Sequence, residues 1–208
     1  MNRFVKLSAA VLCVAAISCG TPTSLVQRWS DPTFTGAPGE SMMIIALAKS
    51  ERNQLTWEGA FSNILRAVKV KPIAGSTILS YQAAADEATL KQAVKNSSAD
   101  LVAITRLVSV DKEQTYVPGS SYYTPSPMAY GGYYGYYYSS YAMVSTPGYY
   151  QTDKIYSVET NVYDVKTEKL IWSGVTETLN PETGQDAANS IAQTIVDDML
   201  ASKIIKTK

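Results

Sequence analysis

The sequence has no histidine among its 208 residues, and this absence removes much of the common catalytic chemistry. Serine–histidine triads, imidazole zinc sites and the commonest general base of enzymes are all excluded. Asp197 and Asp198 are neighbours on a predicted helix and point about 100° apart, so we interpret them as a solvated helix face. Glu177 and Glu182 could be drawn as a second pair, but no catalytic set emerges. We therefore expect no catalytic residue, no metal site, no cofactor and no enzymatic activity.

The first nineteen residues have the features of an export signal. Two basic residues precede an uncharged, mostly apolar run over residues 7–17, and the small residue Ser18 stands before Cys19. The run is shorter than the roughly 20 apolar residues of a transmembrane helix. Residues 16–19 (AISC) resemble the lipobox of bacterial lipoproteins. This resemblance predicts a signal peptide over residues 1–18 that is removed.

The lipobox resemblance also implies how the protein is held in the cell. Cys19 becomes the first mature residue and the site of lipidation, with palmitate among the expected chains. Gly20 follows it in place of the Asp that marks inner-membrane retention in enteric-type bacteria. Several acyl chains anchor a protein stably where a single chain does not. We expect a lipoprotein attached to the outer membrane and facing the periplasm.

Cysteine is scarce and the charge is balanced, which limits the possible sites and partners. The two cysteines are Cys13, inside the signal, and Cys19, which leaves no disulfide and no cysteine metal site in the mature chain. Removal of residues 1–18 takes two of the 18 basic residues and none of the 18 acidic ones, for a net charge of about −2. This balance gives no electrostatic footprint for nucleic acid or for an anionic membrane.

The mature chain divides into a tether and one domain. Residues 19–41 are rich in proline and glycine and are interpreted as a lipidated linker, in which Trp29 is expected to pack back onto the domain. Residues 42–205 carry helix and strand periodicities. Strands are expected at 42–48, 77–81, 101–110, 155–164 and 169–178, and helices at about 53–69, at 86–96 and after the helix-start signal at residues 180–182.

This order, β-α-β-α-β, a long insertion, then β-β-α, defines the expected fold class. Alternating strands and helices predict a parallel part of a sheet, and the late hairpin predicts an antiparallel part. An apolar content of 46% is enough for a real core. We therefore expect a single α/β sandwich of three-layer type with a mixed sheet of about five strands.

The insertion at residues 115–152 has no charged residue and holds twelve of the fifteen tyrosines, with five glycines and four prolines. Gly and Pro at this density work against a packed core. The segment is therefore a flexible loop, a recognition surface for a partner protein or for peptidoglycan, or a membrane contact. The candidate partner-binding residues are Tyr122, Tyr123, Tyr130, Tyr133, Tyr134, Tyr136, Tyr137, Tyr138 and Tyr141.

Three further motifs accompany the lipobox: residues 29–32 (WSDP), 99–102 (ADLV) and 162–173 (VYDVKTEKLIWS). Together they resemble an uncharacterised family of small bacterial lipoproteins, a domain of unknown function that also carries a Tyr/Gly-rich insertion. The topology is similar to that of the amino-terminal domain of TolB and of the lipoproteins CsgG and LpoB. These relatives bind partners or assemble, and the resemblance implies no enzyme.

Two functions from different classes remain open. The first is a non-enzymatic outer-membrane lipoprotein whose periplasmic α/β domain binds an envelope partner, a protein or a cell-wall glycan. The alternative is an oligomeric subunit of an assembly or secretion pore that resembles CsgG. Because no residue pattern separates them, the oligomeric state also remains open.

Overall fold

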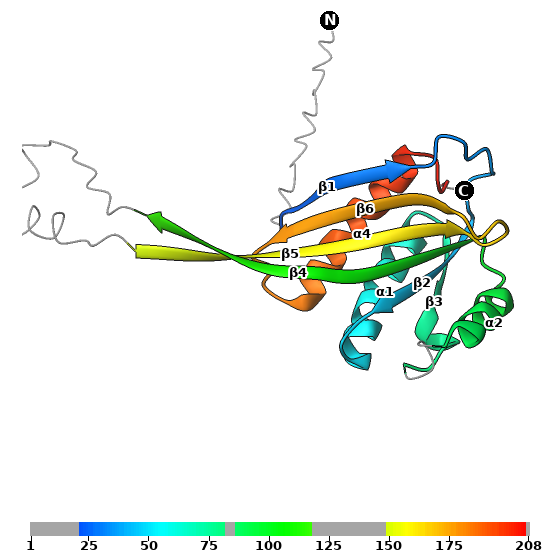
Figure 1. Cartoon of the computed structure of the whole chain (residues 1–208), viewed down its shortest axis with the longest axis horizontal. Coiled ribbons are helices and arrows are strands. Elements are labelled where there is room, and N and C mark those ends of the chain that lie inside the picture. Colours follow the sequence, from blue (N-terminus) through cyan, green and yellow to red (C-terminus); the bar gives the residue numbers. More distant parts are fainter. Residues whose placement is uncertain (1–20, 82–85, 118–148, 207–208) are drawn as a thin grey trace, which may run out of the picture.

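The computed structural model describes residues 21–81, 86–117 and 149–206. Its elements are, in order, β1 (Thr23–Ser30), β2 (Ser41–Leu47), α1 (Glu51–Ala67), β3 (Lys71–Ala74), a 3₁₀ turn (Gly75–Thr77), α2 (Glu87–Ser97), β4 (Leu101–Val117), β5 (Tyr149–Asp164), β6 (Leu170–Leu179) and α4 (Gly184–Ala201). The strands form one six-stranded sheet in the order β1-β6-β5-β4-β2-β3 (Figure 1).

The sheet is mixed, as predicted. β2 pairs in parallel with β3 and with β4, because helices connect these strands. β4, β5, β6 and β1 are antiparallel neighbours, and β5 and β6 form the predicted late hairpin. The α/β class is confirmed, and the sheet has six strands where about five were expected.

The helices begin at side-chain caps. Ser50 accepts a hydrogen bond from the backbone N–H of Asn53 at the start of α1, and Asp86 does the same for Thr89 at the start of α2. α4 begins later than the signal at 180–182 predicts, because Thr183 is its N-cap. Asn180 instead has a left-handed backbone, with φ of 44°, in the turn after β6.

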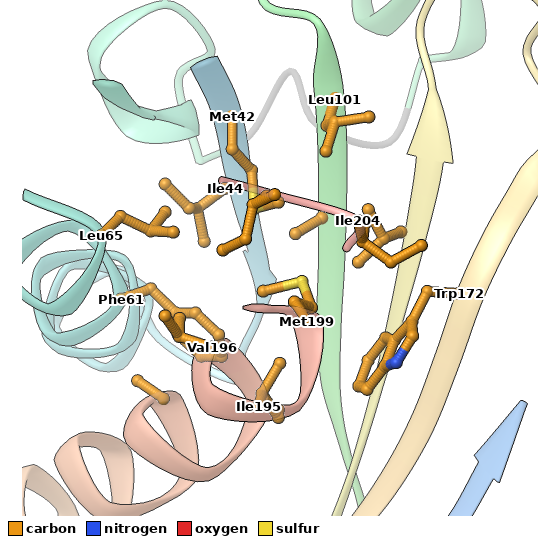
Figure 2. Packing of buried hydrophobic residues seen from close by; sticks show 14 of the residues in the cluster. Met42, Ile44, Phe61, Leu65, Leu101, Trp172, Ile195, Val196, Met199 and Ile204 are labelled. Atoms are coloured by element: carbon orange, nitrogen blue, oxygen red, sulfur yellow. The ribbon is translucent and has the colours of Figure 1, made fainter. Parts of the chain in front are cut away.

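Two layers of helices cover the sheet. α1 and α4 lie on one face, where Phe61, Trp172 and Ile195 are fully buried in the main core (Figures 1 and 2). α2 covers the other face only over the β3–β2–β4 end, where a smaller cluster includes Met43, Ala93 and Val102. The arrangement is the expected three-layer sandwich, with the second helix layer confined to one end of the sheet.

The predicted tether is wrong over residues 23–30, which form edge strand β1 along β6. The sequence did not predict this strand, because its apolar alternation is weak. Leu25 is the one residue of β1 that contacts the core, and the pairing register shifts between Leu25 and Gln27. Trp29 does not pack back as expected, since 46% of its surface is exposed.

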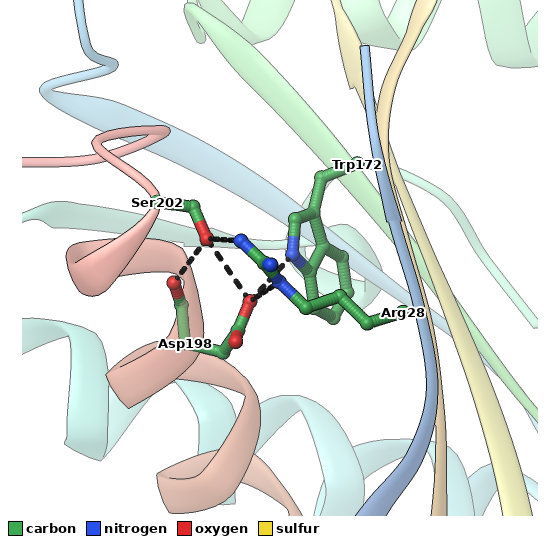
Figure 3. A network of polar contacts seen from close by, with 4 residues as sticks. All are labelled: Arg28, Trp172, Asp198 and Ser202. Atoms are coloured by element: carbon green, nitrogen blue, oxygen red, sulfur yellow. Dashed lines mark hydrogen bonds and ion pairs between the residues drawn. The ribbon is translucent and has the colours of Figure 1, made fainter. Parts of the chain in front are cut away.

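A polar network holds β1 to α4 (Figure 3). Arg28 Nε donates a hydrogen bond to Asp198 Oδ1 at 2.8 Å, and Trp172 Nε1 donates to the same oxygen at 2.9 Å. Arg28 also donates to Ser202 Oγ. Asp197 is exposed as expected, but Asp198 is not part of a solvated face, because its carboxylate joins β1, β6 and α4.

The strand expected at 77–81 is misplaced. The third strand is β3 at 71–74, and residues 75–77 form a 3₁₀ turn. Proline is uncommon within strands because it lacks a backbone N–H. Pro72 is tolerated in β3 because this strand lies at the edge of the sheet.

Two acidic residues of the sequence motifs, Asp100 and Asp164, hold the ends of strands. Asp100 Oδ2 accepts hydrogen bonds from the backbone N–H groups of Glu40 and Ser41 and from Ser41 Oγ, which ties the start of β4 to the start of β2. Asp164 Oδ1 accepts from the backbone N–H groups of Lys166 and Thr167 in the β5–β6 turn. These residues are therefore structural.

β4 and β5 are longer than predicted and continue into the ends of the Tyr/Gly-rich insertion. Residues 115–117 pair with residues 149–151, so these parts of the expected loop are strand. Within the described ranges, no helix is long and apolar enough to cross a membrane.

Candidate functional site

Cys19 and the nine candidate tyrosines fall outside the described residues, in segments 1–20 and 118–148. The tyrosines concerned are Tyr122, Tyr123, Tyr130, Tyr133, Tyr134, Tyr136, Tyr137, Tyr138 and Tyr141. Their proposed roles stay predictions. The described part of the chain nevertheless has two surface features, a groove and a projecting arm. The strands of the arm end where residues 118–148 begin and end.

The groove has a volume of about 1030 Å³ and lies where β2 ends beside β4. Its walls come from the end of β2, the first turns of α1, the middle of β4, β5 and the turn before α4. The rim combines apolar and charged side chains: Leu47 is 50% exposed and Leu107 and Val110 are each 43% exposed, and the exposed Lys49, Arg106 and Glu182 also line the groove. Exposed apolar side chains around a concave surface are typical of a binding site.

The free edge of β4 forms one side of the groove. The pairing of β4 with β2 ends at Arg106, opposite Leu47, and beyond that point the described residues place no strand on this side of β4, while β5 continues along the other side. The backbone groups from Ser109 onward are therefore available on this side. Such an edge can pair with an extended peptide.

A buried polar pair shapes the wall between α1 and β2. The Glu58 carboxylate is 1% exposed and accepts hydrogen bonds from Gln54 Nε2 at 3.0 Å, Ser76 N at 2.8 Å and Ala46 N at 3.3 Å. Gln54 also lines the groove, and its Oε1 is buried without a hydrogen-bond partner among the described residues. Because this oxygen is buried, it is not exposed to a ligand in the groove.

The arm is the two-stranded end of the sheet, residues 112–117 of β4 paired with residues 149–154 of β5. It starts beyond the Ile155–Leu179 pair, where β6 leaves the sheet, and it projects away from the domain (Figure 1). Asn180 braces its base, since Lys154 N donates to Asn180 Oδ1 at 2.8 Å. The tyrosine rings of Tyr116 and Tyr150 lie near its outer end, with centroids 5.2 Å apart.

Like charges face each other across the arm. Lys112 pairs with Lys154, and Glu113 pairs with Asp153 one position further out on β4. The hydrogen bond from the Gln151 side chain, followed by that from Asn180, lowers the pKa of the Asp153 carboxyl below its usual value. Asp153 is thus a carboxylate at neutral pH, and each like-charge pair disfavours the arm as an isolated ribbon.

The described residues contain no group of three or more His, Cys, Asp or Glu side chains placed to hold a metal ion. Glu177 lies on β6 and Glu182 in the turn before α4, so this second carboxylate pair is divided between two elements. The groove contains acceptors, donors and apolar surface. Its chemistry suits the binding of a partner.

No known protein family matches the chain, and no curated protein sequence matches it. Solved structures with a similar course of the chain include the PelC dodecamer from Paraburkholderia phytofirmans, at 12% identity and a TM-score of 0.44, covering 89% of this chain and 99% of that one. Lipoprotein GNA1162 from Neisseria meningitidis is 7% identical, with a TM-score of 0.41 and coverage of 77% and 98%. A minor lipoprotein from Acinetobacter baumannii is 9% identical, with a TM-score of 0.33 and coverage of 83% and 99%.

Proposed function

We propose that this chain is a non-enzymatic lipoprotein of the bacterial outer membrane whose periplasmic α/β domain binds a partner protein of the envelope. The lipobox at residues 16–19 supports the anchor. The groove supports the binding role, and the observation that carries it is the set of exposed apolar side chains beside the free edge of β4. A cell-wall glycan bound by the tyrosines of residues 118–148 stays the second possible ligand.

The groove favours an extended segment of protein as the ligand. Leu47, Leu107 and Val110 offer apolar contacts to its side chains, and the edge of β4 offers backbone hydrogen bonds. Apolar contacts set the affinity of such a site, and the polar groups set its register.

Site-specific photocrosslinking in living cells tests this function. A photoreactive residue at Val110, in the groove, is compared with one at Val26, an equally exposed valine on β1. We expect one discrete adduct from position 110 that the substitution Leu107→Asp removes, and none from position 26. The same adduct from both positions, or an adduct that survives Leu107→Asp, contradicts the groove as the binding surface.

The alternative function, a subunit of an oligomeric assembly, draws on the same free edge. An unpaired strand edge can also pair with a second copy of the chain. The size of the acylated protein in mild detergent separates the two. A defined ring favours the assembly subunit, and a monomer favours the partner-binding lipoprotein.

A further inference from the structure

The chain enters β1 at the end of the sheet from which the arm projects. Thr23 pairs with Thr178, and Thr178 pairs in turn with Tyr156, two residues from the arm. The backbone N–H of Leu179 donates to Pro22 O at 3.2 Å, just before β1 begins. β1 and β4 are three strand spacings apart, about 14 Å across the sheet.

The domain holds the chain almost up to the proposed lipid anchor. Ser190 Oγ on α4 donates a hydrogen bond to Thr21 O at 2.7 Å. Thr21 follows Cys19 by two residues, which span at most about 7 Å. The expected tether thus shrinks to a few residues. An acylated Cys19 therefore keeps this end of the domain against the bilayer.

The arm is long enough to reach the same bilayer. Its six residue pairs extend about 20 Å beyond the sheet. Cys19 precedes Thr23 by four residues and lies at most about 14 Å beyond the start of β1. The chain enters β1 at the end of the sheet where the arm begins, and the arm is longer than the greatest distance at which Cys19 can lie from Thr23.

The two faces of the arm differ in chemistry. Side chains alternate along a strand, so Lys112, Tyr116, Tyr150 and Lys154 lie on one face, which we call the Lys–Tyr face. The opposite face carries Glu113 and Asp153 near the base and Val117 and Tyr149, which is 61% exposed, at the outer end; it is called the acidic face.

The Lys–Tyr face matches the surface of an anionic membrane. Tyr116 and Tyr150 are 54% and 70% exposed, and tyrosine favours the boundary between lipid headgroups and acyl chains. Lys112 and Lys154 are exposed and have no ion pair among the described residues. Anionic headgroups attract such lysines and repel the acidic face. An anionic membrane surface therefore relieves the repulsion between Lys112 and Lys154, and it favours contact with the Lys–Tyr face over contact with the acidic face.

The geometry points to a membrane contact: we propose that the Lys–Tyr face of the arm docks on the anionic phospholipid surface that holds Cys19. The contact rests on the proposed lipid anchor and goes beyond it, because the arm fixes how the domain stands on the membrane. The groove at the base of the arm then opens close to the bilayer.

Fluorescence quenching on vesicles tests the contact with the acylated full mature chain. Because Cys19 carries the acyl chains, a second cysteine can be labelled alone. Labels are placed by Gln114→Cys on the Lys–Tyr face, Thr115→Cys on the acidic face and Glu168→Cys in the β5–β6 turn at the far end of the sheet. The vesicles contain phosphatidylethanolamine, phosphatidylglycerol and a quencher at headgroup depth.

We expect strong quenching at position 114, weaker quenching at 115 and none at 168. Replacement of both lysines, Lys112→Gln with Lys154→Gln, should weaken the contact about fivefold for each lysine removed. Lys166→Gln, in the β5–β6 turn, is the matched control and should change nothing. Vesicles without phosphatidylglycerol should reduce the signal as the double variant does.

Different results separate the anchor from the arm. Failure of the protein to float with vesicles contradicts the lipid anchor and hence the proposed function. Flotation with equal quenching at 114 and 168 overturns the arm contact and leaves the anchor intact. A third result also overturns the membrane contact: the label at 114 is shielded by a second copy of the chain in detergent and is not quenched on vesicles. The oppositely charged faces of two arms would then pair with each other in an assembly.

Discussion

Glu58 shows how a single buried charge can organise the wall of the groove. Its carboxylate receives all three hydrogen bonds from neutral N–H groups, which come from α1, β2 and the 3₁₀ turn. Gly75 leaves room for this arrangement, because an added Cβ would lie 2.8 Å from Ile44 O and 3.2 Å from Glu58 Oε1. The residue therefore fixes the position of α1 relative to the end of β2.

We predict that Glu58→Gln lowers the free energy of unfolding by about 2 kcal/mol, because an amide cannot accept all three bonds and leaves buried donors unpaired. Glu51→Gln, an exposed change on the same helix, is the control and should cost less than about 1 kcal/mol. Urea denaturation measures both. Equal losses for the two variants would show that the buried carboxylate has no special role.

The stripe of α1 was predicted from sequence, and its centre is the deepest part of the core. Phe61 is completely buried, whereas Leu55 on the same helix is 52% exposed. We predict that Phe61→Ala costs about 3–5 kcal/mol, which is a large part of the roughly 5–15 kcal/mol that stabilises a typical domain. Leu55→Ala should cost less than about 0.5 kcal/mol. Thermal unfolding followed by circular dichroism checks the difference, and similar midpoints would contradict the assignment.

At the scale of elements, the described residues form the main core without the strand ends that flank the Tyr/Gly-rich insertion, since no described residue between 104 and 157 belongs to it. We predict that a short Gly/Ser linker in place of residues 120–146 leaves the thermal midpoint nearly unchanged. Loop length costs only about 0.6 kcal/mol per doubling, so the shorter loop is neutral or slightly stabilising. A large loss of stability in thermal unfolding would mean that the tyrosines belong to the core.

The elements that sequence predicted well are those with one strong periodicity. The stripe of Phe61, Ile64 and Leu65 gave α1, and the apolar run at 42–48 gave β2, because a single pattern dominates each segment. β1 has no such pattern, because this edge strand is held mainly by backbone pairing with β6 and not by a row of buried side chains. β3 was obscured by Pro72, which only an edge position can accommodate.

The candidate site was less accessible to sequence than the fold. The groove brings together Leu47, Trp57 and Tyr156 from three distant segments. The spacing of residues within one segment cannot predict that such segments meet in the fold. The arm was read as loop, because the strand pattern fades beyond Val110 and the pairing partner lies some forty residues away. The like-charge pairs that define its faces depend on the pairing register of β4 with β5. The sequence of one strand does not contain this register.

At the scale of the whole molecule, the predicted lipid anchor at Cys19 would decide where the domain works. We predict that Cys19→Ser abolishes lipid labelling and leaves the protein as an uncleaved or mislocalised precursor, because the serine hydroxyl does not replace the thiol as acyl acceptor. Labelling of cells with radioactive palmitate measures the change. Cys13→Ser, inside the signal, is the control and should keep normal labelling. Unchanged labelling of Cys19→Ser would exclude Cys19 as the site.

The pairing of β1 with β6 has a mechanical consequence for a protein tied to a membrane at Cys19. A pull on the anchor acts along the axis of β1, because the chain enters the strand from the membrane side. The seven residue pairs between β1 and β6 then carry the load together in shear, and cannot open one after another as in a zipper. The clamp from Arg28 to Asp198 adds resistance in the same direction. With Cys19 as the anchor, the strand that was expected to be a linker would bear the tension between bilayer and domain.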